Sequence, residues 1–262
     1  MRSAAIGAAG SLGIAEALYP HSDRAVVEME RIFMPQGNEE GQLFDTWPEK
    51  YDQWFTTPIG SLIKKVEDEL LLDLLKPARG ERILDAGCGT GVFTQEVLSR
   101  GSKVTGLDVS LPMLMRAGQK AQGSAFQGTA GDILTLPFPG NCFDKTVSVT
   151  ALEFIADGPR AVGELFRVTR TGGVIVVATL NSLSPWATRR KEEAQKGHTL
   201  FQKVIFRSPE ELVSLAPVRG ITRTAVHFRK EDDPDRAAGI EQEGRRRGLN
   251  TGAFLAARWV KP

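Results

Sequence analysis

The stretch ILDAGCGTG at residues 83–91 places three glycines at alternate positions, behind an apolar run that ends in an aspartate. Glycine adopts positive φ angles at little cost and lets a ligand approach the backbone without meeting a Cβ atom. A helix that begins after such a loop also offers unpaired N–H groups to a ligand. Gly87, Gly89 and Gly91 are therefore candidate binding residues. GxGxG alone is weak evidence, because dinucleotide-binding enzymes use the related GxGxxG.

Two aspartates near these glycines narrow the choice of ligand. Asp108 ends the apolar part of GLDVS, where a carboxylate accepts hydrogen bonds from ribose hydroxyls, and this fits NAD as well. Asp85 lies directly before the glycines, where its charge is unfavourable for a pyrophosphate and favourable for a ligand with an ammonium group. S-adenosylmethionine (SAM) carries such a group. An NAD-linked oxidoreductase is thus the less favoured alternative.

A third feature concerns the adenine ring of such a ligand. The sequence GDI at residues 131–133 follows a short expected strand. Asp132 can accept a hydrogen bond from the exocyclic amine of adenine, while Val109 and Ile133 offer apolar surfaces to the ring. Together with the glycines and the two aspartates, this combination is more specific than any of its parts.

The elements that position these residues alternate between strands and helices. Apolar residues at helical spacing predict helices, and short apolar runs predict buried strands. Such alternation predicts a Rossmann-like, doubly wound, mostly parallel α/β sheet. Because no helical pattern is recognised between the last two strands, they are expected to form a hairpin that makes the seventh strand antiparallel. The expected helices span residues 61–76, 92–100, 111–121, 158–169 and 208–216, and the expected strands span 82–86, 103–110, 125–132, 143–150, 172–180, 220–229 and 252–261.

From residue 51 to 179 the chain resembles the class I SAM-dependent methyltransferases, in particular the group that includes the ubiquinone and menaquinone biosynthesis enzymes. ILDAGCGTG, GLDVSLPMLMRA, GDILTLPFPGNCFD and ELFRVTRTGGVIVV are similar to motifs of that family. The resemblance implies strand order 3-2-1-4-5-7-6 with strand 7 antiparallel. It implies contacts from Asp85 and the glycines to the methionine part of SAM, from Asp108 to the ribose, and from Asp132, Ile133 and Val109 to the adenine. The full expected cofactor-binding set is Tyr51, Asp85, Gly87, Cys88, Gly89, Gly91, Asp108, Val109, Asp132, Ile133 and Thr150.

The sequence departs from the family at two places. Thr171 replaces the proline of the usual LKPGG, which changes the rigidity of a turn rather than the ligand site. After the fourth strand the chain reads TALEFIAD, whereas many relatives carry a histidine pair there. Glu153 is therefore the candidate for orienting the acceptor or accepting its proton. The alternative is a surface or helix-capping carboxylate paired with a basic residue.

Three segments are candidates for covering the site. In WPEKYDQWF, the aromatic residues Tyr51, Trp54 and Phe55 are expected to close over SAM and its acceptor, or else simply to dock a helix. A lid insertion near residues 181–207 brings aromatic and basic side chains, including Trp186 and Arg189, which suit an acidic or aromatic acceptor unless they belong to a solvated helix. A second insertion near residues 230–250 is expected to be exposed and mobile, and its Arg245–Arg247 run is a weak candidate for phosphate or nucleic acid.

Composition excludes several classes of protein. The 262 residues carry a formal charge of +1, so neither nucleic acid nor an anionic membrane is an expected partner. Two cysteines, Cys88 and Cys142, indicate neither disulfides nor a metal site, which fits the cytoplasm. The N-terminal stretch resembles a secretory signal only superficially, because Glu16 interrupts it. We expect an extension over residues 1–45, partly disordered or helical, and a catalytic domain over 46–262.

The sequence therefore predicts a SAM-dependent methyltransferase that acts on an O, N, S or C atom of a small-molecule acceptor. A non-catalytic SAM-binding or assembly protein is the alternative from another class. The acceptor and the oligomeric state stay open.

Overall fold

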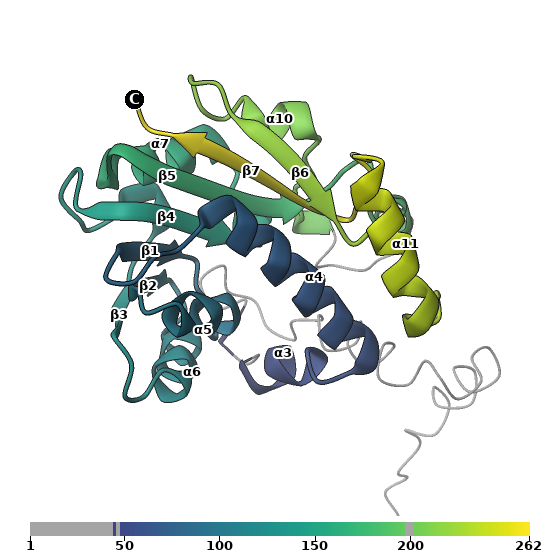
Figure 1. The fold of residues 1–262 in the computed structure, drawn as a ribbon, viewed down its shortest axis with the longest axis horizontal. Coiled ribbons are helices and arrows are strands. Elements are labelled where there is room, and N and C mark those ends of the chain that lie inside the picture. The colour runs from purple at the N-terminus through teal and green to yellow at the C-terminus, as the bar shows by residue number, and fades with distance from the viewer. Residues whose placement is uncertain (1–43, 46–47, 197–201) are drawn as a thin grey trace, which may run out of the picture.

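The computed structural model describes residues 44–45, 48–196 and 202–262. They contain a seven-stranded sheet flanked by helices (Figure 1). The strand order is β3-β2-β1-β4-β5-β7-β6; β7 is antiparallel to both of its neighbours, and the other pairs are parallel. The predicted sheet is therefore confirmed, including its antiparallel last strand. The strands are β1 (Arg82–Ala86), β2 (Lys103–Asp108), β3 (Phe126–Ala130), β4 (Phe143–Val149), β5 (Thr169–Leu180), β6 (Ile221–Ala225) and β7 (Phe254–Val260).

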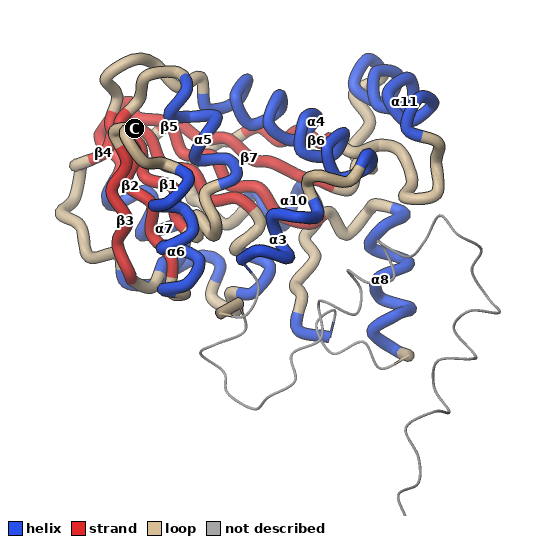
Figure 2. The backbone as a smooth tube through the Cα atoms, turned by 90° about the horizontal axis from the view of Figure 1, so that it is seen from below, coloured by secondary structure: helices blue, strands red, loops and turns tan. Residues whose placement is uncertain are grey.

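Helices cover both faces of this sheet, and Figure 2 shows α4, α5 and α11 along the same side of it. Two short 3-10 helices, η1 and η2, follow β3 and β4. The helices are α3 (Pro48–Trp54), α4 (Pro58–Leu75), α5 (Val92–Ser99), α6 (Leu111–Lys120), η1 (Ile133–Thr135), η2 (Leu152–Phe154), α7 (Gly158–Val168), α8 (Pro185–Gln195), α10 (Pro209–Val213) and α11 (Pro234–Arg246).

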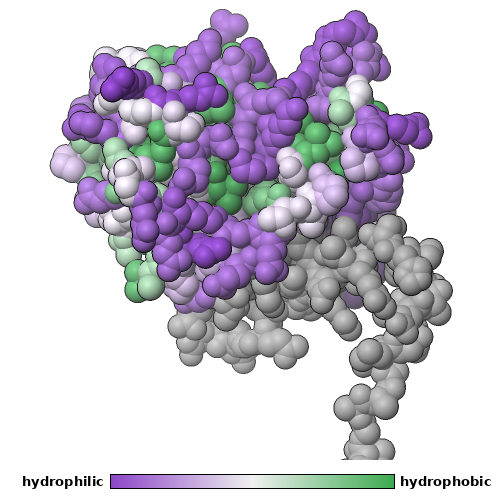
Figure 3. Space-filling view, turned by 60° about the horizontal axis from the view of Figure 1, so that its bottom comes forward, coloured by the Kyte–Doolittle hydropathy of each residue, from purple (hydrophilic) through white to green (hydrophobic). Residues whose placement is uncertain are grey.

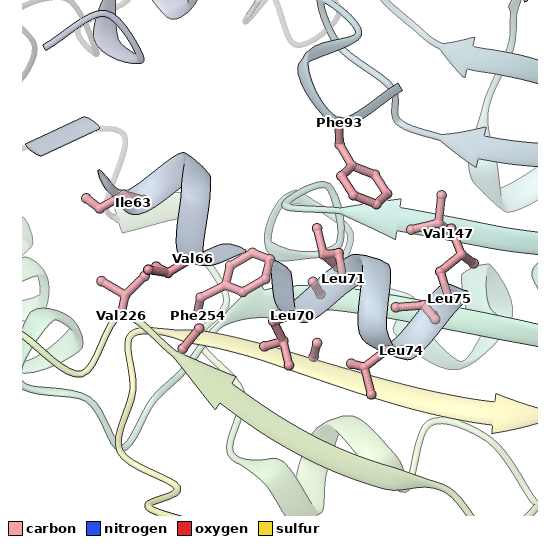
Figure 4. Packing of buried hydrophobic residues seen from close by; sticks show 14 of the residues in the cluster. Ile63, Val66, Leu70, Leu71, Leu74, Leu75, Phe93, Val147, Val226 and Phe254 are labelled. Atoms are coloured by element: carbon pink, nitrogen blue, oxygen red, sulfur yellow. The ribbon is translucent and has the colours of Figure 1, made fainter. Parts of the chain in front are cut away.

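The core is divided by the sheet into two clusters of buried apolar side chains. Because successive side chains of a strand point to opposite faces, Val176 of β5 joins the cluster under α4 while Ile175 and Val177 join the one under α7. Figure 4 shows Leu70 and Leu74 pointing from α4 toward the strands. Strands buried on both faces are continuous apolar runs, which explains the sequences of β1 and β5.

Helix α4 begins and ends at local signals. The hydroxyl of Thr57 accepts a hydrogen bond from the Gly60 N–H at 3.1 Å, and Pro58 occupies the first turn. Lys76 adopts a left-handed conformation with φ 48° and ends the helix, and its N–H donates to the Leu72 carbonyl. The helix expected over residues 61–76 is confirmed, and it begins three residues earlier and ends one residue earlier than predicted.

The expectation of a helix-free connection between β6 and β7 is wrong. Helix α11 occupies this connection, capped by Asp233, whose side chain accepts from the Asp235 N–H at 2.9 Å. Its buried positions include Ala237, Glu241 and Gly244, which recur at helical spacing but contain only one ordinary apolar residue. A charged composition therefore concealed an amphipathic helix, and β6 and β7 pair without forming a tight hairpin.

Most of the N-terminal extension expected over residues 1–45 lies outside the described residues, apart from Phe44 and Asp45. No helix in the described ranges is long and apolar enough to cross a membrane. On the face shown in Figure 3, the described surface is mainly hydrophilic, with apolar side chains in separate small patches.

Candidate active site

The glycine loop between β1 and α5 has the conformation that its sequence requires. Gly87, Gly89 and Gly91 have φ angles of 77°, 52° and 75°. A Cβ atom built on Gly87 would lie 2.5 Å from the Cβ of Ala151, so the loop packs directly against the turn that contains η2. A Cβ on Gly89 would meet no atom of the described residues within 4 Å. Gly87 thus serves packing, while Gly89 leaves space beside the backbone for a ligand.

We expect Gly87→Ala and Gly89→Ala to have different effects. The Gly87 variant combines a left-handed backbone with a steric clash and should lose roughly 2 to 5 kcal/mol of unfolding free energy. The Gly89 variant should lose only about 1 to 2 kcal/mol, from its backbone conformation, but should bind the ligand more weakly. Chemical denaturation and calorimetric titration measure both effects. Equal stability losses in the two variants would contradict the packing role assigned to Gly87.

Two acidic side chains flank this loop. Asp85 is 2% exposed, and its carboxylate accepts a hydrogen bond from the Thr94 hydroxyl at 2.6 Å. Burial raises the pKa of Asp85 to about 6, and the charge of Asp108 acts in the same direction. Asp108 ends β2 and accepts hydrogen bonds from the N–H groups of Gly89 at 2.8 Å and Ser110 at 2.9 Å. Burial raises the pKa of Asp108 as well. The structure therefore brings both predicted acids to the loop.

Asp132, Ile133 and Val109 lie at the ends of the neighbouring strands β3 and β2. Asp132 is exposed and caps η1 by accepting from the Leu134 N–H at 2.8 Å. Ile133 is buried, whereas Val109 is 64% exposed, which is unusual for an apolar side chain at the end of a buried strand. An exposed valine and an exposed carboxylate at one sheet edge suit the apolar face and the amine of an adenine ring.

Cys88 lies within the glycine loop and is buried. A Cβ on Gly106 of β2 would lie 2.8 Å from its sulfur, so the thiol packs closely against the backbone of that strand. Burial raises the pKa of the thiol well above its ordinary value, which keeps it protonated and unreactive. The small side chain is therefore explained by packing. No group of residues in the described parts of the chain has the composition of a metal site.

Helix α3 is joined to the glycine loop by the hydrogen bond from Thr90 to Asp52, and the aromatic residues in and after α3 have different surroundings. Burial raises the pKa of Tyr51, whose hydroxyl forms a hydrogen bond with Thr150. Thr150 itself has a φ of 48°, a strained conformation for a branched residue. The ring of Phe55 contacts that of Tyr51 edge-on at 5.3 Å, while Trp54 packs against the core under α4. Tyr51 therefore lies beside Thr150 at the end of β4, whereas Trp54 lies against the core.

Asp52, next to Tyr51, is a residue that the sequence analysis missed. Its carboxylate accepts hydrogen bonds from the Thr90 hydroxyl at 2.7 Å, from Arg116 at 2.9 Å and from Lys120. Burial opposes ionisation, but these bonds outweigh it and hold the pKa of Asp52 below its ordinary value. Asp52 thus connects α3 with the glycine loop and with α6.

Glu153 is part of η2, directly after β4. It is 2% exposed, and the Thr179 hydroxyl donates a hydrogen bond to its carboxylate at 3.1 Å. Burial raises the pKa of Glu153 to about 7, although the positive charges of Arg190 and Arg207 oppose this shift. Burial excludes the surface position in the alternative, whereas the nearby charges of Arg190 and Arg207 agree with its other part, a carboxylate paired with a basic residue. A buried carboxyl with a pKa near 7 can give or take a proton at physiological pH.

The turn that contains Glu153 is held by the segment after α8. Arg207 is buried and donates to the carbonyls of Leu152 at 2.8 Å and Ile155 at 3.2 Å. The Ile205 N–H donates to the backbone carbonyl of Glu153 at 2.8 Å. Part of the predicted insertion at 181–207 thus fixes the backbone on both sides of the candidate catalytic residue.

Four titratable side chains from α3, α4, η2 and α8 influence one another electrostatically, and we call Tyr51, Glu67, Glu153 and Arg190 the Glu153 cluster. Burial raises the pKa of Glu67 to about 8 and lowers that of Arg190 to about 10. The sequence indicated Arg190 only as one of the basic residues of the insertion near 181–207, and it gave no sign of Glu67 or of an influence of either residue on Glu153.

The other residues proposed for the lids have structural contacts. Trp186 is 7% exposed and its indole N–H donates to the Phe228 carbonyl at 2.8 Å. Arg189 lies over the Trp186 ring and pairs with Glu193 at 3.5 Å and Glu231 at 3.4 Å. Residues 197–201 of this insertion lie outside the described residues.

The arginine run at the end of α11 does not form an open anion site, because its first two members are paired with acidic side chains. Arg245 donates to Glu241 at 2.7 Å, to Glu69 at 3.0 Å and to the Val66 carbonyl at 2.7 Å. Arg246 pairs with Glu243 at 2.7 Å. Most of segment 230–250 is thus the helix α11, which is attached to α4, in place of the expected mobile segment.

Comparison with known proteins identifies relatives of this arrangement. Residues 84–177 match a family model described as a methyltransferase domain. The chain is 34% identical over 217 residues to malonyl-[acyl-carrier protein] O-methyltransferase of Pectobacterium atrosepticum, a match that covers 74% of this chain and 79% of that protein. It is 31% identical over 180 residues to demethylmenaquinone methyltransferase of Corynebacterium kroppenstedtii, covering 68% of this chain and 76% of that protein.

A solved structure supports the fold. A SAM-dependent methyltransferase of Thermotoga maritima superposes with a TM-score of 0.62 at 20% identity, covering 86% of this chain and 100% of that one. The range matched by the family model contains the glycine loop, Asp108 and Glu153.

Proposed function

This chain belongs to the SAM-dependent methyltransferases, and we propose that it transfers the methyl group to an acceptor that gives up a proton to Glu153. Family membership decides against the NAD-linked oxidoreductase and favours an enzyme over a non-catalytic binding protein. The observation that carries the proposal is the burial of Glu153 with a pKa of about 7. Its turn touches the glycine loop through Ala151 and Gly87, which supports a place for Glu153 near the acceptor.

The residues around the loop fit SAM. Asp108 presents carboxylate oxygens at the end of β2 for the ribose hydroxyls, and Gly89 leaves the adjacent backbone open. Asp85 is a buried carboxyl whose hydrogen-bond donor in the structure is the neutral Thr94 hydroxyl, so a ligand ammonium would supply the missing positive charge. Val109 and Asp132 would contact the adenine.

SAM supplies a methyl group already activated by the sulfonium, so the protein mainly has to align the acceptor and exclude water. Tyr51, beside Thr150, would cover the reacting end. Glu153 would hold the proton released by the acceptor, and Arg190 would stabilise the carboxylate in its ionised form. This division of roles suits a hydroxyl group or a carbon acid, both of which must lose a proton during methylation.

The relatives differ in acceptor, since one is named for malonyl-[acyl-carrier protein] and another for demethylmenaquinone. A carboxylate acceptor is already ionised at neutral pH and has no proton to give to Glu153. The Glu153 cluster therefore favours a phenol, hydroquinone or enol. Transfer of tritium from methyl-labelled SAM to a reduced quinone and to a malonyl thioester tests this choice. Turnover of the malonyl thioester alone would overturn the proposed acceptor class without affecting the assignment of the donor.

The pH dependence of SAM binding tests the role of Asp85. Its pKa of about 6 in the free protein lies above the ordinary value because of burial, and a ligand ammonium favours the ionised form. The affinity for SAM should therefore rise as the pH rises through about 6, with about tenfold weaker binding at pH 5 than on the plateau. Calorimetric titration between pH 5 and 7 measures this change.

Asp85→Asn is the matched control for that experiment. The variant keeps an oxygen that can accept the Thr94 hydrogen bond but has no titrating group. It should bind SAM about tenfold more weakly at pH 7 and show a flatter pH dependence than the wild type. An undiminished rise in affinity through pH 6 in this variant would assign the titration to another group.

The cytoplasmic location of the protein stays a prediction.

A further inference from the structure

The contacts of Asp52 span three parts of the molecule that are distant in sequence. Its partners are Thr90 in the glycine loop and Arg116 and Lys120 on α6, at sequence separations of 38, 64 and 68 residues. The Asp52 side chain is 15% exposed, and Thr90 is fully buried. Lys120 also donates to the Thr90 hydroxyl at 3.1 Å. The carboxylate therefore joins α3 to the loop through a connected set of hydrogen bonds.

Helix α3 depends on such contacts, because seven residues are too few for a stable isolated helix in water. Helix α3 contacts α6 and lies near the start of α4 (Figure 1). Neighbouring side chains on a helix point in directions about 100° apart. As a result, Asp52 faces the glycine loop and α6 while Tyr51 reaches Thr150 at the end of β4.

We propose that Asp52 is a positioning residue that fastens α3 over the donor site and thereby holds Tyr51 at the reacting end. Thr90 belongs to the loop that would bind the methionine part of SAM, so the bond from its hydroxyl to Asp52 links the cover directly to the ligand site. SAM can enter, and its demethylated product S-adenosylhomocysteine can leave, only when α3 moves away from the loop. The bonds of Asp52 therefore set how fast the product escapes.

Two residues before α3, Phe44 and Asp45, make further contacts that hold this part of the chain against the site. The hydroxyl of Ser110 donates to the Asp45 carboxylate at 2.6 Å, and the Ser110 N–H donates to Asp108. Phe44 contacts the ring of Phe154 in η2 edge-on at 5.0 Å. Phe44 and Asp45 thus contact residues at both the proposed ribose end and the proposed acceptor end of the site.

The rate at which S-adenosylhomocysteine dissociates is the direct test, and stopped-flow displacement from the full-length protein measures it without an acceptor. Asp52→Asn should raise this rate about tenfold, because the charged hydrogen bonds to Arg116 and Lys120 become weaker neutral ones. Lys120→Met should also raise the dissociation rate, because it removes the ammonium group that donates to Asp52. Glu49→Gln removes the same charge from an exposed position on α3 and should leave the rate within twofold of the wild type.

A double variant of Asp52 and Tyr51 distinguishes a positioning role of Asp52 from a general effect of this residue on stability. If Asp52 acts through Tyr51, the turnover number of the Asp52→Asn, Tyr51→Phe double variant should equal that of Tyr51→Phe alone within about twofold. Multiplied losses in the double variant would overturn the positioning role. An unchanged dissociation rate in both Asp52→Asn and Lys120→Met, with thermal midpoints showing folded proteins, would also overturn it. The inference rests on the proposed function only for the role of Tyr51. The dissociation rate reports on how firmly α3 is held over the donor site, even where the proposed acceptor is wrong.

Discussion

Replacing Asp108 with alanine should weaken SAM binding at least about 100-fold and leave the fold intact. The carboxylate is the acceptor assigned to the ribose hydroxyls, and each lost hydrogen bond to a charged group costs about 1.5 to 3 kcal/mol. The alanine also frees the N–H groups of Gly89 and Ser110, which Asp108 now holds. The pairing of β2 with β1 and β3 uses backbone groups and does not depend on this side chain. Calorimetric titration with SAM and a thermal melt measure the two effects.

Asp108→Asn is the informative companion to this variant. Its amide oxygen can still accept a hydrogen bond from Gly89 or Ser110, so the loop should stay close to its present conformation. Binding should fall by about tenfold, less than in the alanine variant, because one charged acceptor becomes neutral. A normal SAM affinity in a folded Asp108→Ala protein would falsify the ribose assignment.

The approach of Asp108 to the glycine loop was predictable from sequence because the residues involved follow local patterns. Gly87, Gly89 and Gly91 follow Asp85 within six residues, and each aspartate ends an apolar run that marks a parallel strand. The carboxyl ends of neighbouring parallel strands meet at one edge of the sheet. Strand order therefore brings Asp108 to the loop without any knowledge of side-chain packing.

The acceptor side was less predictable because its contacts are long-range. Burial of Glu153 depends on a segment that returns to η2 from more than 50 residues later, through Arg207 and Leu152. The choice between a surface carboxylate and a buried one could not be made from TALEFIAD alone. Asp52 shows the same limit, since an acid among aromatic residues gives no sign of Thr90 and Lys120 as partners.

Helix α11 illustrates a different limit. Its buried face contains Glu241, whose carboxylate accepts from the His227 N–H at 2.8 Å and from Arg245 at 2.7 Å. Burial opposes ionisation of Glu241, but these bonds hold its pKa below its ordinary value. A charged residue on a buried face weakens the apolar pattern by which helices are recognised. Composition therefore indicated a mobile loop where an internal ion pair stabilises a helix.

Replacing Glu153 with glutamine should lower the turnover number by about 100-fold or more while changing SAM affinity by less than threefold. General bases contribute about 100-fold to 10,000-fold to proton transfer, and glutamine cannot accept the proton. The substitution is nearly isosteric, and its amide can retain the hydrogen bond from the Thr179 hydroxyl. Initial rates with labelled SAM and the acceptor measure turnover, and calorimetric titration measures the affinity.

The pH profile distinguishes a base from a residue that only shapes the site. Burial sets the pKa of Glu153 at about 7, so its ionised fraction rises through neutral pH. The value of kcat/KM should therefore rise with pH through about 7 and level off above pH 8, because the reactive form is the deprotonated one. Glu153→Gln should remove this rise and leave a low, flatter profile. A variant that keeps the wild-type profile and turnover would show that Glu153 only supports the turn, and the acceptor would then need no base from this protein.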